Sequence, residues 1–112
     1  MSIKINRLSN VLMKEISYIL ATEVKDKNIK FVTVTDLKLA SDLSFAKVYV
    51  TVLDDSKRDE TMKSLNSARG FIRSKLHDRV DMRHIPEISF VYDESIEYGN
   101  KIEKIINELN KD

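Results

Sequence analysis

The stretch Ser67-Ala68-Arg69-Gly70-Phe71-Ile72-Arg73 places a glycine in the middle of a long helical pattern. Apolar residues recur on both sides of it with the three-and-four spacing of a buried helix face, at Met62, Leu65, Ala68, Ile72, Leu76 and Val80. A glycine inside a helix costs about 1 kcal/mol relative to alanine. The pattern therefore predicts either a break between two helices or the close approach of another molecule at Gly70. The flanking Arg69 and Arg73 make a phosphate backbone one such molecule, and a kink without a ligand is the alternative.

A first helix is predicted from about Asn6, its expected N-cap, to about Val24. Its apolar stripe comprises Ile5, Leu8, Leu12, Ile16, Ile19 and Leu20. No apolar stretch near the N-terminus is long enough for a signal peptide or a membrane span. The chain also lacks cysteine, which fits a reducing compartment, so we expect a cytoplasmic protein that does not bind a membrane.

Three strands are predicted. Residues 31–39 are rich in valine and threonine, and a change in the parity of their inward positions indicates a bulge near Asp36. Residues 45–53 alternate between apolar and polar side chains, as expected for a sheet with one face on the core and one toward solvent. The short connection at residues 40–43 favours a hairpin, and residues 88–92 predict the third strand.

The helices that flank the glycine are predicted from their ends. Ser56 with Asp59 resembles a capping pair, which opens a helix that reaches about Ser67. The second helical piece follows the glycine and reaches about Val80. Residues 81–86 contain the only proline and are expected to form a loop.

A final helix is predicted after a cap at Asp93 or Ser95. Its inward residues are expected to be Ile102, Ile105, Ile106 and Leu109. The element order is then helix, strand, strand, helix, helix, strand, helix, without a linker or repeat. We therefore expect a single α+β domain over residues 1–112, in which helices cover one face of a three-stranded sheet.

Charge is segregated along the chain, although the net charge of its 112 residues is only +1. Residues 1–30 hold six basic and three acidic side chains, and residues 85–112 hold seven acidic residues against three lysines. Residues 69–84 hold two acidic side chains and five basic ones, Arg69, Arg73, Lys75, Arg79 and Arg83. Such segregation permits one basic face that attracts an anion, despite the near-neutral total.

Catalysis is not expected from this sequence. The two histidines, His77 and His84, lack the partner spacing of a metal or nucleophile site, and no phosphate-cradling glycine loop is present. Asp54-Asp55 follows a strand and is expected to be a solvated turn. We therefore expect no cofactor, no metal and no small-molecule substrate.

Binding of an anion is better supported by the residues that follow the glycine. Arg69, Arg73 and His77 are spaced by four residues and share one stripe of a helix, and Lys75 and Arg79 make a second such pair. Arginine suits phosphate because its planar fork donates bidentate hydrogen bonds. The first turn of the helix also offers free N–H groups to an anion. Of these side chains, Arg73 and Arg79 are expected to face solvent.

Other roles for the same side chains remain open. The cations could pair with the nearby Asp78 and Asp81 instead of an RNA. Tyr49 and Phe45 could stack on bases, but exposed aromatic residues on strands more often cover the edge of a core.

Several ordered blocks make the sequence resemble the ribosome-binding factor A family of bacterial small-subunit assembly factors, over essentially its whole length. The matching blocks are residues 42–53, 70–73, 85–93 and 95–102. The resemblance implies a type II KH-like fold, in which Ala68-Arg69-Gly70 forms an interhelical kink in place of the G-x-x-G loop of ordinary KH domains. One departure concerns the first helix, where the family often has a pair of arginines: Arg7 matches one, and Asn10 replaces the other.

The function that the resemblance implies is transient association with the small (30S) ribosomal subunit and its 16S rRNA. It includes late maturation of that rRNA, with processing of its 5′ end, and importance in the cold. On this hypothesis the chain is a non-enzymatic RNA-binding factor and a monomer when free. The residues expected to contact rRNA phosphates are Arg69, Arg73, Lys75, Arg79 and Arg83, with Lys4 and Arg7 as auxiliaries.

The alternative hypothesis is a small module that docks a protein partner through the exposed face of its sheet. That face is expected to carry Phe45, Lys47, Tyr49 and Thr51. Salt distinguishes the two hypotheses, because phosphate contacts depend steeply on salt concentration and an interface built on the sheet depends on it weakly.

Overall fold

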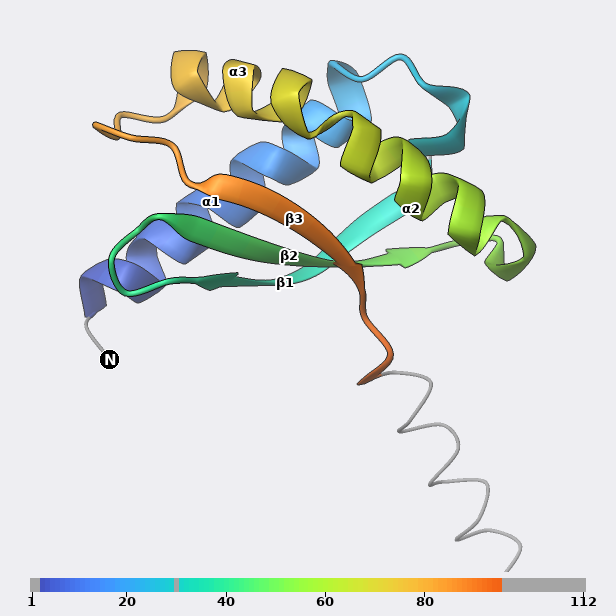
Figure 1. The fold of residues 1–112 in the computed structure, drawn as a ribbon, viewed down its shortest axis with the longest axis horizontal. Coiled ribbons are helices and arrows are strands. Elements are labelled where there is room, and N and C mark those ends of the chain that lie inside the picture. Colours follow the sequence, from blue (N-terminus) through green and yellow to red (C-terminus); the bar gives the residue numbers. More distant parts are fainter. Residues whose placement is uncertain (1–2, 30, 96–112) are drawn as a thin grey trace, which may run out of the picture.

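A computed structural model describes residues 3–29 and 31–95 and arranges them as helices on one side of a sheet (Figure 1). In chain order the helices and strands are α1 (Ile3–Thr22), β1 (Val32–Leu39), β2 (Phe45–Val52), α2 (Arg58–Ser67), α3 (Arg69–Arg79) and β3 (Glu87–Tyr92). Two short 3-10 turns, η1 (Lys27–Ile29) and η2 (Asp55–Lys57), precede β1 and α2. The predicted order is thus confirmed as far as the third strand, and the predicted final helix lies outside the described residues.

The three strands form one sheet in the order β1-β2-β3. β1 and β2 are antiparallel, which confirms the predicted hairpin, and β3 lies parallel to β2. The register shifts between Val34 and Asp36, which confirms the bulge. In the hairpin turn Leu43 adopts a positive φ of 65°, and its N–H donates to the Ala40 carbonyl oxygen at 2.9 Å.

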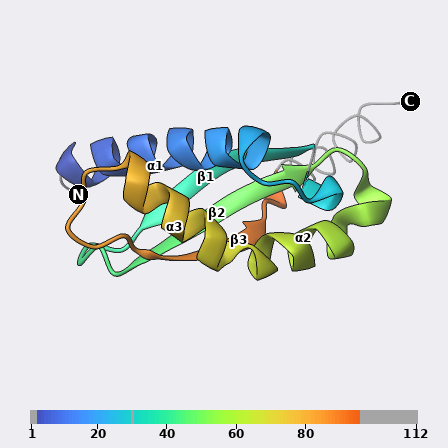
Figure 2. The ribbon, with the colours of Figure 1, turned by 90° about the horizontal axis from the view of Figure 1, so that it is seen from above.

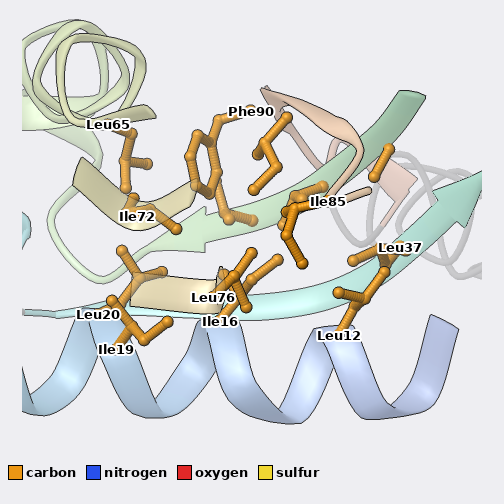
Figure 3. Close-up of a cluster of buried hydrophobic side chains, with 14 of the residues drawn as sticks. Leu12, Ile16, Ile19, Leu20, Leu37, Leu65, Ile72, Leu76, Ile85 and Phe90 are labelled. Atoms are coloured by element: carbon orange, nitrogen blue, oxygen red, sulfur yellow. The ribbon is translucent and has the colours of Figure 1, made fainter. Parts of the chain in front are cut away.

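The core lies between the sheet and the helices (Figures 2 and 3). From β2 the side chains of Ala46, Val48 and Val50 point into it and are fully buried. The largest buried side chains that the helices contribute are Leu12, Ile16, Ile19, Leu65, Ile72 and Leu76. The opposite face of the sheet carries no helix of the described part of the chain, so the alternation seen in the sequence corresponds to one covered and one open face.

Two predicted helix starts are wrong. α1 begins at Ile3, so Asn6 lies inside the helix and does not cap it. Before α2, the carboxylate of Asp54 accepts hydrogen bonds from the backbone N–H and the hydroxyl of Ser56, at 3.1 and 2.7 Å. These bonds organise η2 and lower the pKa of Asp54, whereas Lys57 at the N-cap of α2 makes no side-chain cap. A carboxylate two residues ahead is a stronger acceptor than a serine hydroxyl, so Asp54 organises this turn.

Replacement of Leu76 by alanine should lower the free energy of unfolding by about 2–5 kcal/mol, because it leaves a cavity where α3 meets the core. Leu53→Ala is the matched control, since the Leu53 side chain is 78% exposed and its loss should change stability by less than about 0.5 kcal/mol. Urea denaturation of the two variants measures the difference. Equal effects of the two substitutions would contradict the assignment of the core.

Candidate RNA-binding surface

The long helical pattern of the sequence is divided in the structure at Ala68. α2 ends at Ser67 and α3 begins at Arg69, and the two helices run in different directions (Figure 2). Ala68 has φ −89° and ψ 2°, outside the helical range of ψ, while its N–H donates to the carbonyl oxygens of Ser64 and Leu65. The chain therefore bends without leaving this amide unpaired.

Gly70 is not the residue that bends. It lies in the first turn of α3 and does not have a positive φ, so its backbone conformation is open to any residue. A Cβ built on it would meet no other atom within 4 Å. Neither the backbone nor the packing of the described residues requires a glycine here. Because Gly70 has no side chain, the surface of the first turn of α3 is open at this position.

A groove of about 350 Å³ runs between the break and the start of β3. Its lining residues are Asn66, Ser67, Arg69, Gly70, Arg73, Glu87 and Ile88. The groove thus brings together two of the predicted phosphate-binding arginines with the glycine between them, and Glu87 is its one carboxylate. The first N–H groups of α3 also lie at this end, where a helix cannot satisfy them itself.

Two side chains bind α2 and α3 to β3 and to the loop that precedes it. Arg73 donates to the Ile85 carbonyl oxygen from Nε and Nη2, at 3.1 and 2.8 Å. Asn66 pairs with the backbone of Phe90, accepting from its N–H at 3.2 Å and donating to its carbonyl oxygen at 3.5 Å. The sequence did not identify Asn66 as a residue of this surface. The only signal for it is a side-chain amide at a half-buried position of a helix.

The groove arginines keep donors for a ligand. Arg69 uses Nε to reach the Asn66 carbonyl oxygen at 2.9 Å, and Arg73 uses two of its N–H groups on Ile85. A guanidinium has five N–H donors, so each side chain can bind a phosphate without giving up its contact within the protein. Arg73 is exposed, as expected, and its hydrogen bonds to Ile85 also anchor the loop that leads into β3.

Lys75 and Arg79 lie on the other flank of α3 and face α1. The Arg79 guanidinium is hydrogen-bonded to Glu15 and lies over the Tyr18 ring, 4.2 Å from its centroid, and the bond to Glu15 raises the pKa of Arg79. Lys75 lies 3.8 Å from the carboxylate of Glu23. The acidic partners therefore come from α1 and the turn that follows it, not from Asp78 and Asp81.

The helical period explains this division. Residues 69 and 73 flank the buried Ile72–Leu76 stripe on one side, whereas residues 75 and 79 flank it on the other. Arg79 is therefore exposed, as expected, but its guanidinium is engaged by Glu15 and Tyr18.

A second hollow, of about 550 Å³, brings together Lys4 and Arg83 near the start of α1. His84, which the sequence did not point to, lines it as well, with Asp42 and Asp81 as the acidic members. The next residue, Ile85, is the one that accepts from Arg73, so the loop joins this hollow to the groove. Arg7 is exposed on α1 and lines neither of them.

Residues 3–29 and 31–95 contain neither a candidate metal site nor a candidate membrane-spanning helix. No group of three histidine or acidic side chains in these ranges is arranged to hold a metal ion. None of the helices in this part of the chain has the length and apolar character needed to cross a membrane.

Comparison with known proteins gives the family. The family model for ribosome-binding factor A matches residues 4–106. The chain belongs to the ribosome-binding factor A family. Ribosome-binding factor A of Macrococcus caseolyticus is 48% identical over 113 residues, which cover 100% of this chain and 99% of the relative.

Ribosome-binding factor A structures share the fold. The crystal structure from Thermus thermophilus has a TM-score of 0.70 at 22% identity, covering 79% of this chain and 93% of that one. A homology model of the Thermus thermophilus protein, fitted into the cryo-EM map of a complex of 30S with ribosome-binding factor A, has a TM-score of 0.68 at 23% identity and the same coverage. The likeness confirms the α+β, KH-like arrangement, and the RNA contacts of individual residues stay predictions.

Reversal of charge at Arg79 should lower the midpoint of urea unfolding, since it removes an ion pair and a cation–π contact and sets two carboxylates against each other. The exchanged pair Arg79→Glu with Glu15→Arg should recover part of that loss. Arg83→Glu, at an exposed loop position, is the control and should change stability by less than about 0.5 kcal/mol. Urea denaturation of these variants makes the comparison, and an Arg79→Glu variant as stable as the wild type would show that the contact with α1 contributes nothing.

Proposed function

We propose that this chain is a non-enzymatic assembly factor that binds the small (30S) ribosomal subunit and its 16S rRNA in the cytoplasm. It acts in late maturation of that rRNA, including processing of the 5′ end, and its action matters most in the cold. The observation that carries the proposal is the groove at the α2–α3 break, with Arg69, Gly70 and Arg73, in a chain of the ribosome-binding factor A family. The Thermus thermophilus relative fitted into the map of a 30S complex supports the same partner.

An RNA backbone fits this groove for three physical reasons. Arg69 and Arg73 have unused N–H donors that can form charge-assisted hydrogen bonds to phosphate oxygens. The N-terminus of α3 favours negative charge. The open space beside Gly70 lets a sugar-phosphate chain approach the helix closely. Phosphate contacts of this kind position the protein on the RNA, and specificity comes from RNA shape and the neighbouring ribosomal surfaces.

The contact extends along the loop that joins the groove to the second hollow. Lys4, Arg83 and His84 would bind further phosphates there. Lys75 and Arg79 are assigned instead to the contact between α1 and α3. Arg7 is an exposed cation on α1 that lines neither hollow, and it contributes through its charge alone.

Binding alone can drive the proposed maturation step. A protein that binds one of two RNA arrangements more tightly shifts the equilibrium toward it by the difference in affinity. Misfolded RNA helices are more stable at low temperature and rearrange slowly. The factor would therefore matter most in the cold, and it would not need to hydrolyse a nucleotide.

Gly70→Ala separates binding from folding. Because the added Cβ meets no atom of the protein and alanine favours a helix, the variant should be more stable by about 0.5–1 kcal/mol. The same methyl group should weaken binding to purified 30S subunits if an RNA backbone lies against α3. Ser74→Ala, at an exposed position of the same helix, is the control and should leave binding unchanged. Sedimentation of labelled protein with 30S subunits measures binding.

The salt dependence of that binding tests the alternative of a protein-docking module. The affinity of the wild-type chain should fall steeply as salt rises, because phosphate contacts release counterions. Arg69→Ala combined with Arg83→Ala should make the dependence shallower. A weak dependence in the wild type, together with normal binding of Gly70→Ala, would move the interface away from the groove.

Cells without this protein should accumulate 16S rRNA with unprocessed 5′ ends, and more so at low temperature than at the optimal one. Primer extension and sucrose-gradient profiles of a deletion strain measure the ends and the subunit ratio. A plasmid copy of the wild-type gene should restore both, and a Gly70→Ala copy should restore them incompletely. Normal ends and ratios in the deletion strain grown cold would defeat the maturation role.

A further inference from the structure

Two lysines lie directly opposite each other on the open face of the sheet. Lys38 of β1 and Lys47 of β2 are paired in register, and both are exposed. Like charges in such a pair destabilise an antiparallel sheet. In the described part of the chain, no carboxylate forms an ion pair with either lysine. The fold thus keeps an unfavourable pair whose repulsion a bound anion would relieve.

Aromatic side chains flank these lysines on the same face. Phe45 and Tyr49 precede and follow Lys47 by two residues on β2, so all three point to the open side. Phe45 is 36% exposed, and Lys38 Nζ lies 5.5 Å from the centroid of the Tyr49 ring. We refer to Lys38, Phe45, Lys47 and Tyr49 as the open-face patch.

Three carboxylates lie near the patch, and none of them forms an ion pair with Lys38 or Lys47. Asp36, in register with Tyr49, accepts a hydrogen bond from the Leu37 N–H at 2.8 Å. Glu87 is in register with Phe45 at one end of the patch. At the other end the Asp93 carboxylate accepts from Thr35 and Ser95 hydroxyls, at 2.5 and 2.6 Å, which lower its pKa. The ammonium groups of the two lysines are therefore available to an anion.

We propose that the open-face patch binds single-stranded RNA, with phosphates at Lys38 and Lys47 and bases stacked on Phe45 and Tyr49. Cationic side chains beside aromatic rings on a sheet are the combination that holds unpaired bases and their backbone. This surface lies on the opposite side of the sheet from the helices and the groove (Figure 1). It goes beyond the proposed function, because it gives the chain a second RNA contact.

Lys38→Glu is the sharpest test, because stability and binding should move in opposite directions. The substitution places a carboxylate opposite Lys47, so the unfolding midpoint in urea should rise. Affinity for a labelled ten-nucleotide oligouridylate should fall about tenfold, as phosphate contacts of one lysine are replaced by repulsion. Lys57→Glu is the control, because it changes the net charge equally at an exposed residue away from the patch. The Lys57→Glu variant should bind the oligouridylate at least about threefold more tightly than the Lys38→Glu variant, because it keeps both lysines of the patch.

Stacking of bases on Tyr49 can be measured separately by tryptophan fluorescence. The chain contains no tryptophan, so Tyr49→Trp introduces a single fluorophore into the patch. Its emission should be quenched by the oligouridylate and not by an abasic oligomer with the same number of phosphates. Tyr18→Trp, at an exposed position of α1 beside Arg79 of α3, is the control and should respond to neither.

The inference is overturned by any of four results: no binding of the oligouridylate, equal affinities of Lys38→Glu and Lys57→Glu, no quenching of the Tyr49→Trp reporter, or shielding of that reporter from iodide in the free full-length chain. Shielding would mean that the chain itself occupies the face. Gly70→Ala distinguishes this failure from failure of the proposed function. If Gly70→Ala weakens 30S binding while Lys38→Glu leaves oligouridylate binding at the level of its control, the groove stands and the open-face patch does not.

Discussion

The burial of one face of the central strand is the constraint on which the rest of the structure depends. Ala46, Val48 and Val50 of β2 are fully buried, and that burial requires helices on their side of the sheet. The parallel partner β3 needs a crossover connection, which α2 and α3 supply. The same arrangement leaves the other face of the sheet without a helix in the described part of the chain.

The break at Ala68 follows from the same constraint. Leu65 of α2 and Ile72 of α3 are both fully buried, although the sheet beneath them is twisted. A helix pair that bends between these residues can keep both side chains in the core. The bend then exposes the start of α3 beside β3, where the groove forms. Packing thus creates the place at which a ligand can approach the helix end.

The cations of α3 have divided roles because a helix presents them on two flanks. Arg73 anchors the loop before β3 and lines the groove, whereas Arg79 binds Glu15 and Tyr18 of α1. Hence one run of basic residues in the sequence serves both the assembly of the core layer and the candidate interface. Total charge cannot distinguish these roles, because only direction on the helix separates them.

The sequence by itself determined the order of the elements as far as β3, the bulge near Asp36, the hairpin and the alternating faces of β2, because each depends on side chains that are neighbours along the chain. It also placed Arg69, Gly70 and Arg73 at the junction of two helices. Only the tertiary structure decided that Ala68 carries the bend, that Asn66 binds β3 and Arg73 the loop before it, and that Arg79 contacts α1. These are contacts between residues far apart in sequence, such as Glu15 and Arg79, and local periodicity contains no information on which acceptor a long side chain will meet.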